Sequence, residues 1–457
     1  MANSDAAPRL FGTDGVRGTA GRHPLDPATV RRLGAALVRA AVAPGSAAAL
    51  NRPMQILVGR DTRESGAWIE AELAHGASGE GAIVTSAGVV PTPAIAYLTR
   101  TSGYDAGVVI SASHNPFEDN GIKVFSGAGE KFTETIERQV EAIIADASWS
   151  VAGDAAEPVE ESDLRFEYLE HLRDILPAAY RTPGMRIAID CANGATATVA
   201  PRLFQEMGFE VSCIGVTPDG RNINLGCGST APDSLARLVV DGQHSMGVAF
   251  DGDGDRAIFV DRSGCVVDGD AVMLMCAKQM KREQRLKGNA IVATVMSNIG
   301  LELALRDAEI EMIRCAVGDK YVMEEMLRRD LSLGGEQSGH IIFSDYLFTG
   351  DGLATALNVL RTMSAARREL GELASELTTY PQVLMNLRVR QKVDLKTIPE
   401  IAAAISSVDS RLAGNGRLLV RYSGTEPLLR VMLEGQDPVE IRQWGQEILD
   451  VVKRHLA

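Results

Sequence analysis

The sequence predicts an α/β protein with three similar α/β domains that have mixed sheets, followed by a smaller C-terminal α+β domain. Short β-branched runs alternate with helix-like segments over most of the chain, which is typical of α/β folds. At 457 residues the chain is too long for one hydrophobic core. After Pro381 the order changes to strand, helix, two strands and helix. We therefore expect domains at residues 1–165, 166–264, 265–380 and 381–457.

The first domain begins with a polar, glycine-rich segment, Phe11–Gly18, which includes Arg17. Asp26 and Pro27 then supply an N-cap and a first-turn proline for a helix that extends to about Val42. A strand that runs into a polar loop is expected next, at Gln55–Asp61. A helix should begin at about Ser65, and a short strand should follow at Ala82–Thr85.

The stretch Val108–Phe125 carries the first clear chemistry. It starts with the pattern of a buried strand and then breaks into small and polar residues, which place Ser113 and His114 before tight turns. Lys123 lies on the next extended segment. Taken alone, the stretch is better explained as a strand, a turn and a strand, with Ser113 as a cap and His114 as an ordinary loop histidine. Isolated Ser-His pairs are common and rarely nucleophilic.

The second domain opens with a strand pattern at Arg186–Asp190 and ends at Asp251, Asp253 and Asp255, which alternate with glycines directly after a strand. Two like charges about 4 Å apart repel by roughly 4 kcal/mol at an effective dielectric constant of about 20, so three neighbouring carboxylates need a cation. A calcium-binding EF-hand loop is excluded because arginines stand where its glycine and glutamate would be. Carboxylates on a glycine-rich loop suit Mg²⁺. The other interpretation is a solvated acidic turn.

Polar loops also occur between the expected elements of the remaining two domains. In the third domain, a strand pattern at Ala290–Val295 precedes a small loop at Ala316–Lys320 and the segment Gly334–His340, which on its own is an ordinary polar turn with a histidine. In the C-terminal domain, Arg421–Arg430 places two guanidinium groups, two hydroxyls and a glycine between strands, a combination that can surround a phosphate. From chemistry alone, phosphate binding and a plain turn are equally supported there.

Composition limits the possible classes of function. The net charge of −14 disfavours general binding to nucleic acid or to an anionic membrane, and no run of residues is long and apolar enough to span a bilayer. Six cysteines without a Cys-x-x-Cys pair fit a reducing, cytoplasmic location. Arg31-Arg32 before an apolar segment is superficially similar to a twin-arginine export signal. Because Arg39 interrupts that segment and cleavage would remove Arg17, we do not expect export.

Together the motifs resemble those of the α-D-phosphohexomutases, in the same order along the whole chain: Phe-Gly-Thr-Asp-Gly-Val-Arg-Gly, Ser-Ala-Ser-His-Asn-Pro, Asp-Gly-Asp-Gly-Asp-Arg, Gly-Glu-Gln-Ser-Gly-His and Arg-Tyr-Ser-Gly-Thr-Glu-Pro. The resemblance implies that Ser113 carries a phosphoryl group. It implies that Lys123 is a general acid/base or, alternatively, a charge partner of the phosphoserine. It also implies that Arg17 contacts the phosphoserine region and that His340 lies near the transferred phosphate.

The resemblance further implies metal and substrate residues. One Mg²⁺ per subunit would be held by Ser113, Asp251, Asp253 and Asp255. The substrate-binding residues implied in this way are Arg256, Lys320, Glu336, Ser338, Arg421, Ser423, Gly424, Thr425 and Arg430. Tyr422 departs from the family, which most often has proline at this position, and the departure puts the stiffness of that loop in doubt.

The N-terminal signature and the Gly-Glu-Gln-Ser-Gly-His turn are most similar to family members that act on glucosamine phosphates. The resemblance therefore implies interconversion of glucosamine 6-phosphate and glucosamine 1-phosphate, through phosphorylated Ser113 and a 1,6-bisphosphate intermediate, with a sugar 1,6-bisphosphate as activator. This reaction would feed the synthesis of UDP-N-acetylglucosamine. The active site is expected where the four domains meet. The expected partner is a small phosphosugar, and the sequence leaves monomer and homodimer open.

Two other functions stay open. The chain can be a phosphomannomutase/phosphoglucomutase of the same family, which the relative turnover of glucose, mannose and glucosamine phosphates would reveal. It can also be an inactive regulator that binds sugar phosphates, although the intact Ser113, Lys123 and aspartate triplet disfavour this. A serine hydrolase is disfavoured because the sequence contains no Gly-x-Ser-x-Gly elbow.

Overall fold

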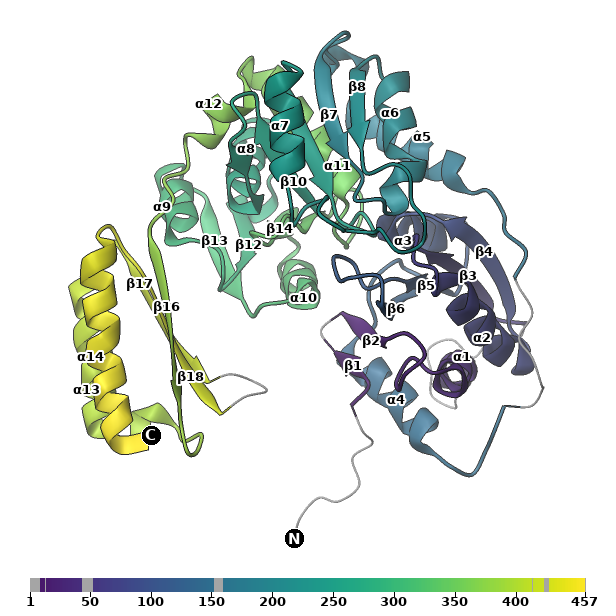
Figure 1. The fold of residues 1–457 in the computed structure, drawn as a ribbon, viewed down its shortest axis with the longest axis horizontal. Helices are drawn as coiled ribbons and strands as arrows, with labels where there is room; N and C mark the ends of the chain where they lie inside the picture. Colours follow the sequence, from purple (N-terminus) through teal and green to yellow (C-terminus); the bar gives the residue numbers. More distant parts are fainter. Residues whose placement is uncertain are drawn as a thin grey trace. The chain divides into compact units, whose positions relative to one another are not determined.

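The computed structural model has four sheets, which follow one another along the chain (Figure 1). It describes residues 9–12, 14–42, 52–151, 159–412, 414–422 and 427–456. The chain forms two compact units, Met1–Met296 with Ile313–Ala374, and Ser297–Met312 with Ser375–Ala457. The four sheets confirm the predicted fold class of three α/β regions and a smaller α+β region. The exact limits of the four domains stay a prediction.

The first region is a six-stranded mixed sheet in the order β1-β2-β6-β5-β3-β4. Strand β3 pairs in parallel with β4 and β5, and the remaining pairs are antiparallel. Its elements are β1 Phe11–Gly12, β2 Gly15–Thr19, α1 Pro27–Val42, β3 Gln55–Arg60, α2 Gly66–Gly79, β4 Ile83–Val89, α3 Thr92–Thr101, β5 Ala106–Ile110, β6 Asp119–Ser126 and α4 Glu134–Ala145. The predicted N-cap of α1 is confirmed, because Oδ1 of Asp26 accepts a hydrogen bond from Thr29 N at 3.0 Å.

Helices α1 and α2 pack at unusually close range. A Cβ atom on Gly34 of α1 would lie 2.0 Å from the carbonyl oxygen of Leu73, and one on Gly76 of α2 would lie 1.8 Å from that of Arg31. Glycine at these two positions therefore lets the helix backbones touch. This contact anchors the helical layer beneath β3 and β5, whose residues belong to one hydrophobic core with those of α1 and α2.

The second region is a five-stranded sheet in the order β11-β10-β9-β7-β8, in which β7 is parallel to β8 and β9. Its elements are α5 Arg165–Ile175, β7 Arg186–Asp190, α6 Ala200–Glu206, β8 Glu210–Ile214, α7 Asp233–Asp241, β9 Met246–Phe250, β10 Ala257–Asp261 and β11 Val266–Val267. All residues of β9 and β10 are buried. The turn between these two strands carries the aspartate triplet.

The third region has a four-stranded sheet in the order β13-β12-β14-β15. Its elements are α8 Gly269–Arg282, β12 Ala290–Thr294, α9 Ile299–Asp307, β13 Glu311–Cys315, α10 Asp319–Arg329, β14 Leu333–Gly335, β15 Ile341–Phe343, α11 Gly352–Ala366 and α12 Leu370–Ala374. Helix α9 belongs to the second compact unit, where Ile299 N donates to Oε2 of Glu434 at 3.0 Å. Sequence order alone places this helix in the third region.

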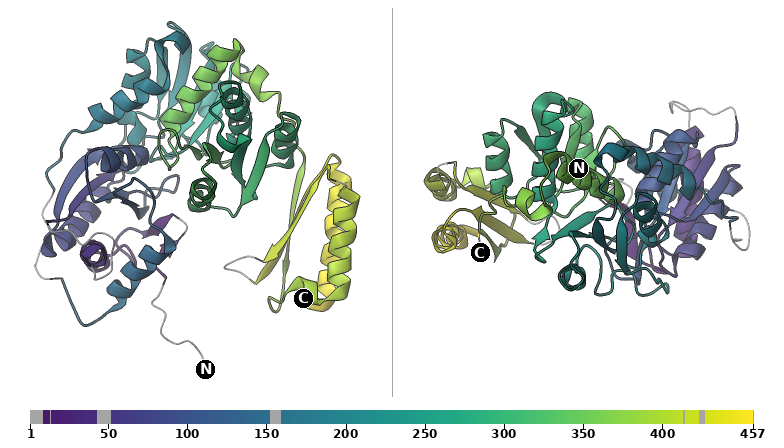
Figure 2. Two further views of the ribbon diagram at one scale, coloured as in Figure 1. Left: turned by 180° about the vertical axis from the view of Figure 1, so that it is seen from behind. Right: turned by 90° about the horizontal axis from the view of Figure 1, so that it is seen from above.

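The C-terminal region is a three-stranded antiparallel sheet in the order β16-β18-β17, with two helices on one face (Figure 2). Its elements are β16 Gln382–Arg388, α13 Pro399–Leu412, β17 Arg417–Tyr422, β18 Leu428–Glu434 and α14 Pro438–Leu456. Asp437 caps α14 by accepting a hydrogen bond from Val439 N at 2.7 Å. The strand, helix, strand, strand, helix order is also confirmed.

Candidate active site

Ser113 lies just past the fully buried strand β5. Its backbone is left-handed, with a φ of 54°, and its side chain is almost completely buried. The hydroxyl donates to Oδ2 of Asp251 at 2.5 Å, and its backbone N donates to Oγ of Ser111 at 2.8 Å. A left-handed conformation is unfavourable for a serine, so the surrounding contacts must hold it.

Arg63 supplies most of those contacts. Its guanidinium is fully buried and donates to four backbone carbonyls of the loop that follows Ser113, those of Ser113, Asn115, Pro116 and Asp119. Its remaining donor, Nε, binds Oδ2 of Asp61 at 2.8 Å. From the second region, Asn224 Nδ2 also donates to the Ser113 carbonyl, at 2.9 Å. The shape of the serine loop is thus fixed by side chains outside it.

The aspartate triplet faces this loop from the turn between β9 and β10. Carboxylate oxygens of Asp251, Asp253 and Asp255 lie within 4.8 Å of one another, and all three residues are buried. The residue between Asp251 and Asp253 must be glycine because the serine loop approaches it closely: a Cβ on Gly252 would lie 2.6 Å from the Ser113 carbonyl oxygen. The sequence prediction that the three carboxylates converge is therefore correct in geometry.

Unused oxygen atoms in the triplet suit a hard divalent cation. Oδ1 of Asp253 and Oδ1 of Asp255 are buried without a hydrogen-bond partner among the described residues. Burial, Asp255 and Asp253 together raise the pKa of Asp251 well above its ordinary value, which shows how strongly the three charges oppose one another. An oxygen-ligated ion such as Mg²⁺ would remove both problems, so the residues present fit the predicted metal.

A neighbouring group, Asp255, Asp319 and His340, also brings three donor atoms within 4.8 Å. Two of its three members already have partners. Lys131 Nζ binds Oδ2 of Asp319, and Nε2 of His340 accepts a hydrogen bond from Gly350 N at 3.0 Å. This group is therefore less suited to an ion than the aspartate triplet.

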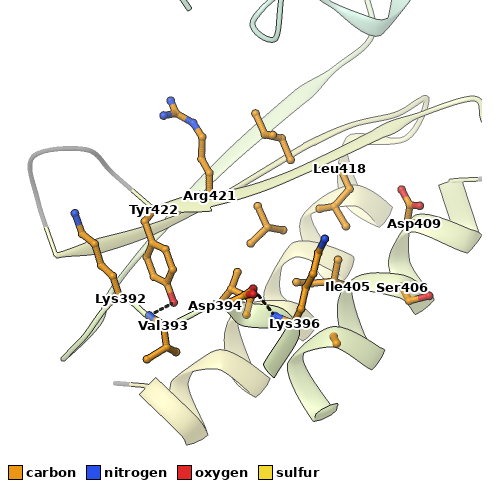
Figure 3. A pocket seen from close by; sticks show the side chains of 14 residues that line it. Lys392, Val393, Asp394, Lys396, Ile405, Ser406, Asp409, Leu418, Arg421 and Tyr422 are labelled. Carbon is orange, nitrogen blue, oxygen red and sulfur yellow. Dashed lines mark hydrogen bonds between the residues drawn. The ribbon is translucent and has the colours of Figure 1, made fainter. Parts of the chain in front are cut away.

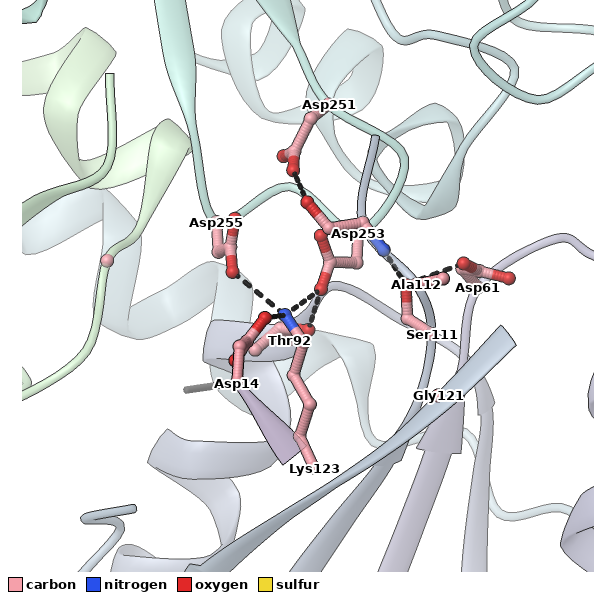
Figure 4. Close-up of polar contacts among 12 residues, drawn as sticks. Asp14, Asp61, Thr92, Ser111, Ala112, Gly121, Lys123, Asp251, Asp253 and Asp255 are labelled. Atoms are coloured by element: carbon pink, nitrogen blue, oxygen red, sulfur yellow. Dashed lines mark hydrogen bonds and ion pairs between the residues drawn. The ribbon is translucent and has the colours of Figure 1, made fainter. Parts of the chain in front are cut away.

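Lys123 extends from β6 toward the aspartate triplet (Figure 4). Its Nζ lies 2.8 Å from Oδ2 of Asp253, 3.0 Å from Oδ2 of Asp255 and 3.1 Å from Oδ2 of Asp14. Burial lowers the pKa of this lysine, but the three carboxylates outweigh burial and hold the pKa well above its ordinary value. A lysine that deprotonates a hydroxyl needs a depressed pKa. In this arrangement Lys123 is therefore a charge partner or a proton donor.

A cavity of about 500 Å³ opens beside these groups. Arg17, His114 and Arg256 line it together with the acidic residues Asp14, Asp319 and Glu336. Arg256 Nη1 lies 3.2 Å from Nδ1 of His114 and can only donate, so Nδ1 is the acceptor. Nδ1 of His114 also lies 3.4 Å from Oγ of Ser113, whose hydroxyl donates to Asp251 at the shorter distance of 2.5 Å. Arg17 and Arg256 thus bring two guanidinium groups to the cavity, and guanidinium groups are suited to bidentate binding of phosphate.

The remaining predicted residues of the third region lie at different depths. Glu336 faces the cavity, and its Oε1 accepts a hydrogen bond from Gly318 N at 3.1 Å. Ser338 is exposed, with its hydroxyl 3.4 Å from Oε2 of Glu336. His340 is buried with Nδ1 3.7 Å from Oδ2 of Asp255 and is not among the cavity-lining residues. Lys320 does not line the cavity either; it forms an ion pair with Glu137.

In the C-terminal region, Arg421 of β17 stands directly opposite Arg430 of β18 in the antiparallel register. Residues opposite one another share a face of the sheet, and like charges there are unfavourable unless an anion lies between them. Arg421 and Tyr422 are both among the residues that line a cavity of about 790 Å³, and Figure 3 shows their side chains extending to opposite sides of β17. Tyr422 Oη accepts a hydrogen bond from Val393 N at 3.3 Å, so the departure from proline gives this aromatic ring a packing role. The predicted residues Ser423, Gly424 and Thr425 lie outside the described residues.

Sequence reasoning missed three residues that shape the site: Arg63, Asn224 and Asp14. The sequence signal that could have identified Arg63 is its position two residues after Asp61, in the polar loop that follows a predicted strand. Asp14 lies within the predicted glycine-rich signature and contacts Arg17, Lys123 and Lys131. These three cations hold the pKa of Asp14 well below its ordinary value against the effect of burial, so it stays charged.

The fold and these site motifs define a phosphohexomutase, and the chain belongs to the phosphoglucomutase/phosphomannomutase family. Family models match four consecutive parts: alpha/beta/alpha domain I at residues 8–150, domain II at 166–264, domain III at 268–380 and the C-terminal domain at 384–451. Among curated relatives, the phosphoglucosamine mutase of Solibacter usitatus is 48% identical over 450 residues, covering 98% of this chain and 99% of that protein. The phosphoglucosamine mutase of Syntrophotalea carbinolica is 46% identical over 453 residues, covering 98% of each chain.

Solved structures share the fold. A phosphoglucomutase/phosphomannomutase family protein from Burkholderia thailandensis superposes with a TM-score of 0.79 at 23% identity, covering 97% of both chains. The Aspergillus fumigatus N-acetylphosphoglucosamine mutase, solved in complex with GlcNAc-6P and magnesium, gives a TM-score of 0.65 at 17% identity, covering 98% of this chain and 96% of that one. Over the described part of the chain, no helix has both the length and the apolar character needed to cross a membrane.

Proposed function

We propose that this protein interconverts glucosamine 6-phosphate and glucosamine 1-phosphate through a phosphoserine at Ser113 and a bound 1,6-bisphosphate. The observation that carries the proposal is the hydrogen bond from the Ser113 hydroxyl to Asp251, inside a cluster of carboxylates with unused oxygens and beside a cavity lined by Arg17 and Arg256. The phosphoglucosamine mutases that are 44–48% identical over nearly the whole chain support this choice of substrate.

In the first half-reaction, the phosphoryl group leaves Oγ of Ser113 and bonds to the free hydroxyl oxygen of the sugar phosphate. The P–Oγ bond breaks as the bond from phosphorus to the sugar oxygen forms; the sugar hydroxyl gives up its proton, and the serine oxygen gains one and again donates a hydrogen bond to Asp251. Lys123, held charged by its carboxylate neighbours, offsets negative charge nearby. After the bisphosphate turns around, the other phosphoryl group passes to Ser113 by the reverse route.

We further propose that one Mg²⁺ binds Asp251, Asp253, Asp255 and the phosphorylated Ser113, where it supplies electrostatic stabilisation of the phosphoryl group. A sugar 1,6-bisphosphate activates the enzyme by phosphorylating Ser113. Arg421 and Arg430, with Ser423, Gly424 and Thr425, bind the phosphate that is not transferred, while Glu336 and Ser338 contact the sugar. The six free cysteines support a reducing, cytoplasmic location.

The deciding experiment is turnover of glucosamine 6-phosphate with Mg²⁺ and a sugar 1,6-bisphosphate, compared with glucose 6-phosphate and mannose 6-phosphate on kcat/KM. We expect a preference for glucosamine 6-phosphate that disappears in Ser113→Ala, with a fall in kcat of about 10⁴-fold or more, as is typical when a nucleophile is removed. Full activity of Ser113→Ala would overturn the phosphoserine route.

A second candidate function, phosphomannomutase/phosphoglucomutase, is favoured by the family models themselves. The same assay separates the two functions. A preference for mannose or glucose phosphate with loss of activity in Ser113→Ala would keep the mechanism and replace the substrate. Phosphosugar binding without any turnover would indicate a regulator instead.

A further inference from the structure

Glu137 and Lys320 form an ion pair between the first and third α/β regions. Glu137 is on α4 and Lys320 is in the first turn of α10, and Oε2 of the glutamate lies 2.7 Å from Nζ of the lysine. The two side chains are only 12% and 8% exposed. An ion pair this poorly solvated is a fixed contact, unlike most surface pairs.

This pair lines two neighbouring empty spaces. On the outside, a cavity of about 520 Å³ is lined by both residues together with Arg9, Glu134 and Tyr321. On the inside, a void of about 10 Å³ is also lined by both residues, together with Lys123, Lys131 and Asp14. A space of that size is at the lower limit for a single water molecule. The ion pair therefore lies between the outer cavity and the buried charges of the active site.

The inner void leads directly to the catalytic groups. Asp14 lines both this void and the 500 Å³ active-site cavity. Its carboxylate contacts Lys123 at 3.1 Å and Lys131 at 2.5 Å, and Lys131 in turn binds Asp319, the residue before Lys320. Water that passed between Glu137 and Lys320 would thus reach Lys123 and Asp14 from behind.

We infer that the Glu137–Lys320 pair is a seal that keeps water in the outer cavity from reaching the buried charges of the active site. The inference rests on the phosphoserine route proposed above. A mutase must pass its phosphoryl group to a sugar hydroxyl and not to water. In the unwanted reaction, a water oxygen bonds to phosphorus, the P–Oγ bond of phosphoserine breaks, and a proton from water ends on the serine oxygen, giving inorganic phosphate and unmodified Ser113. Lys320 then acts in water exclusion and is a positioning residue instead of a sugar ligand.

The experiment compares inorganic phosphate release with mutase turnover. Glu137→Ala removes the acidic half of the seal, and we expect phosphate released per turnover to rise by about tenfold, a difference of the size expected when one buried polar partner is lost. Loss of ³²P from the isolated phosphoenzyme should accelerate equally, while KM for glucosamine 6-phosphate changes little. Glu134→Ala is the matched control, because Glu134 lies on the same helix, lines the same outer cavity and pairs with Arg9 at the exposed surface. It should behave as wild type.

Two further variants keep the test decisive if Glu137→Ala folds poorly. Glu137→Gln retains the volume of the side chain, so phosphate release should rise less than in Glu137→Ala. The charge-reversed double variant Glu137→Lys with Lys320→Glu should bring phosphate release back to within about threefold of wild type, because the pair re-forms in the opposite sense.

Three outcomes have defined meanings. Unchanged phosphate release in Glu137→Ala and Glu137→Gln would overturn the seal. A large rise in KM in the charge-reversed variant, with phosphate release as in wild type, would show that Lys320 binds the sugar directly and would also overturn it. A wild-type enzyme that takes up no ³²P on Ser113 would refute the proposed phosphoserine route itself, independently of every variant at the seal.

Discussion

The hydroxyl of Ser113 and the carboxylate of Asp251 are 138 positions apart in the sequence, yet a hydrogen bond of 2.5 Å joins them. Each residue directly follows a buried stretch of sheet, Ser113 after β5 and Asp251 after β9. The distance between nucleophile and carboxylate is therefore determined by how two separate sheets pack. Changes that move either strand end should affect catalysis before they affect folding.

The aspartate triplet should be needed for metal binding. We expect Asp253→Ala to weaken Mg²⁺ binding at least 10- to 100-fold, the cost of losing even an outer partner of a metal ligand, and to remove activation by added Mg²⁺. Titration with Mn²⁺ followed by electron paramagnetic resonance measures the affinity without reference to activity. Asp241→Ala, an exposed aspartate at the end of α7, is the control. Equal affinity in both variants would contradict the metal assignment.

Arg63 should control the position of the nucleophile. Lysine has three donors and no planar fork, so Arg63→Lys cannot reach all four carbonyls of the serine loop. We expect kcat to fall by about 100-fold, as displacements near 1 Å can cause, with a smaller change in KM. Arg52→Lys, at a half-exposed ion pair with Asp105, should leave kcat unchanged. A wild-type kcat in Arg63→Lys would mean that the loop keeps its shape without this residue.

The contact between α1 and α2 should tolerate no added methyl group. Gly76→Ala places a Cβ 1.8 Å from the Arg31 carbonyl oxygen, so the two helices must separate. We expect a loss of about 1–3 kcal/mol in the free energy of unfolding. Gly79→Ala, in the same helix, meets its nearest atom at 3.7 Å and should be neutral or slightly stabilising, by up to about 1 kcal/mol. Urea denaturation of both variants checks the difference, and equal stabilities would refute the close contact.

Asp351 should make stability depend on pH. Burial raises its pKa to about 6 from the ordinary 3.8, although hydrogen bonds from Ala354 N and the Tyr168 hydroxyl oppose the rise. Between these pH values the folded protein binds a proton that the unfolded chain has released, so this group lowers stability as pH rises from about 4 to 6. Two pKa units correspond to about 3 kcal/mol.

Replacing Asp351 by Asn keeps an acceptor for the N-cap and removes the charge. The melting temperature of Asp351→Asn should therefore equal that of wild type near pH 4 and exceed it increasingly up to about pH 7. Asp268→Asn, at the half-buried N-cap of α8, provides a second Asp-to-Asn change at an N-cap for comparison. A constant difference for Asp351→Asn would show that its pKa is not raised.

Arg421 should serve every phosphosugar alike. The position opposite Arg430 suits the phosphate that both sugar orientations have in common, so Arg421→Ala should raise KM for glucosamine, glucose and mannose phosphates by a similar factor of about 10–100, the size of a lost charged hydrogen bond. Lys396→Ala removes an exposed cation from the same region as a control. A loss confined to one sugar would contradict a common phosphate site.

The sequence predicted site residues best where a reactive polar residue comes soon after a strand. Ser113 and Asp251 could be placed near strand ends because buried runs stop abruptly at polar residues, and the N-cap Asp26 could be predicted from the proline that follows it. The role of Arg63 could not be predicted, since its acceptors are backbone carbonyls and every residue has one. Lys320 shows a second limit: its motif suggested sugar recognition, while its ion pair with Glu137 depends on the packing of two distant helices. The hydrogen bond from Ile299 to Glu434 is likewise a tertiary contact without a local signal.

Arg63 holds the serine loop through carbonyl oxygens and not through side chains, which has an evolutionary consequence. The side chains of Phe117 and Glu118 accept none of these hydrogen bonds, so substitutions there leave the contacts of Arg63 with the loop intact. The surface around the reactive serine can therefore diversify in relatives while the backbone beneath it stays the same.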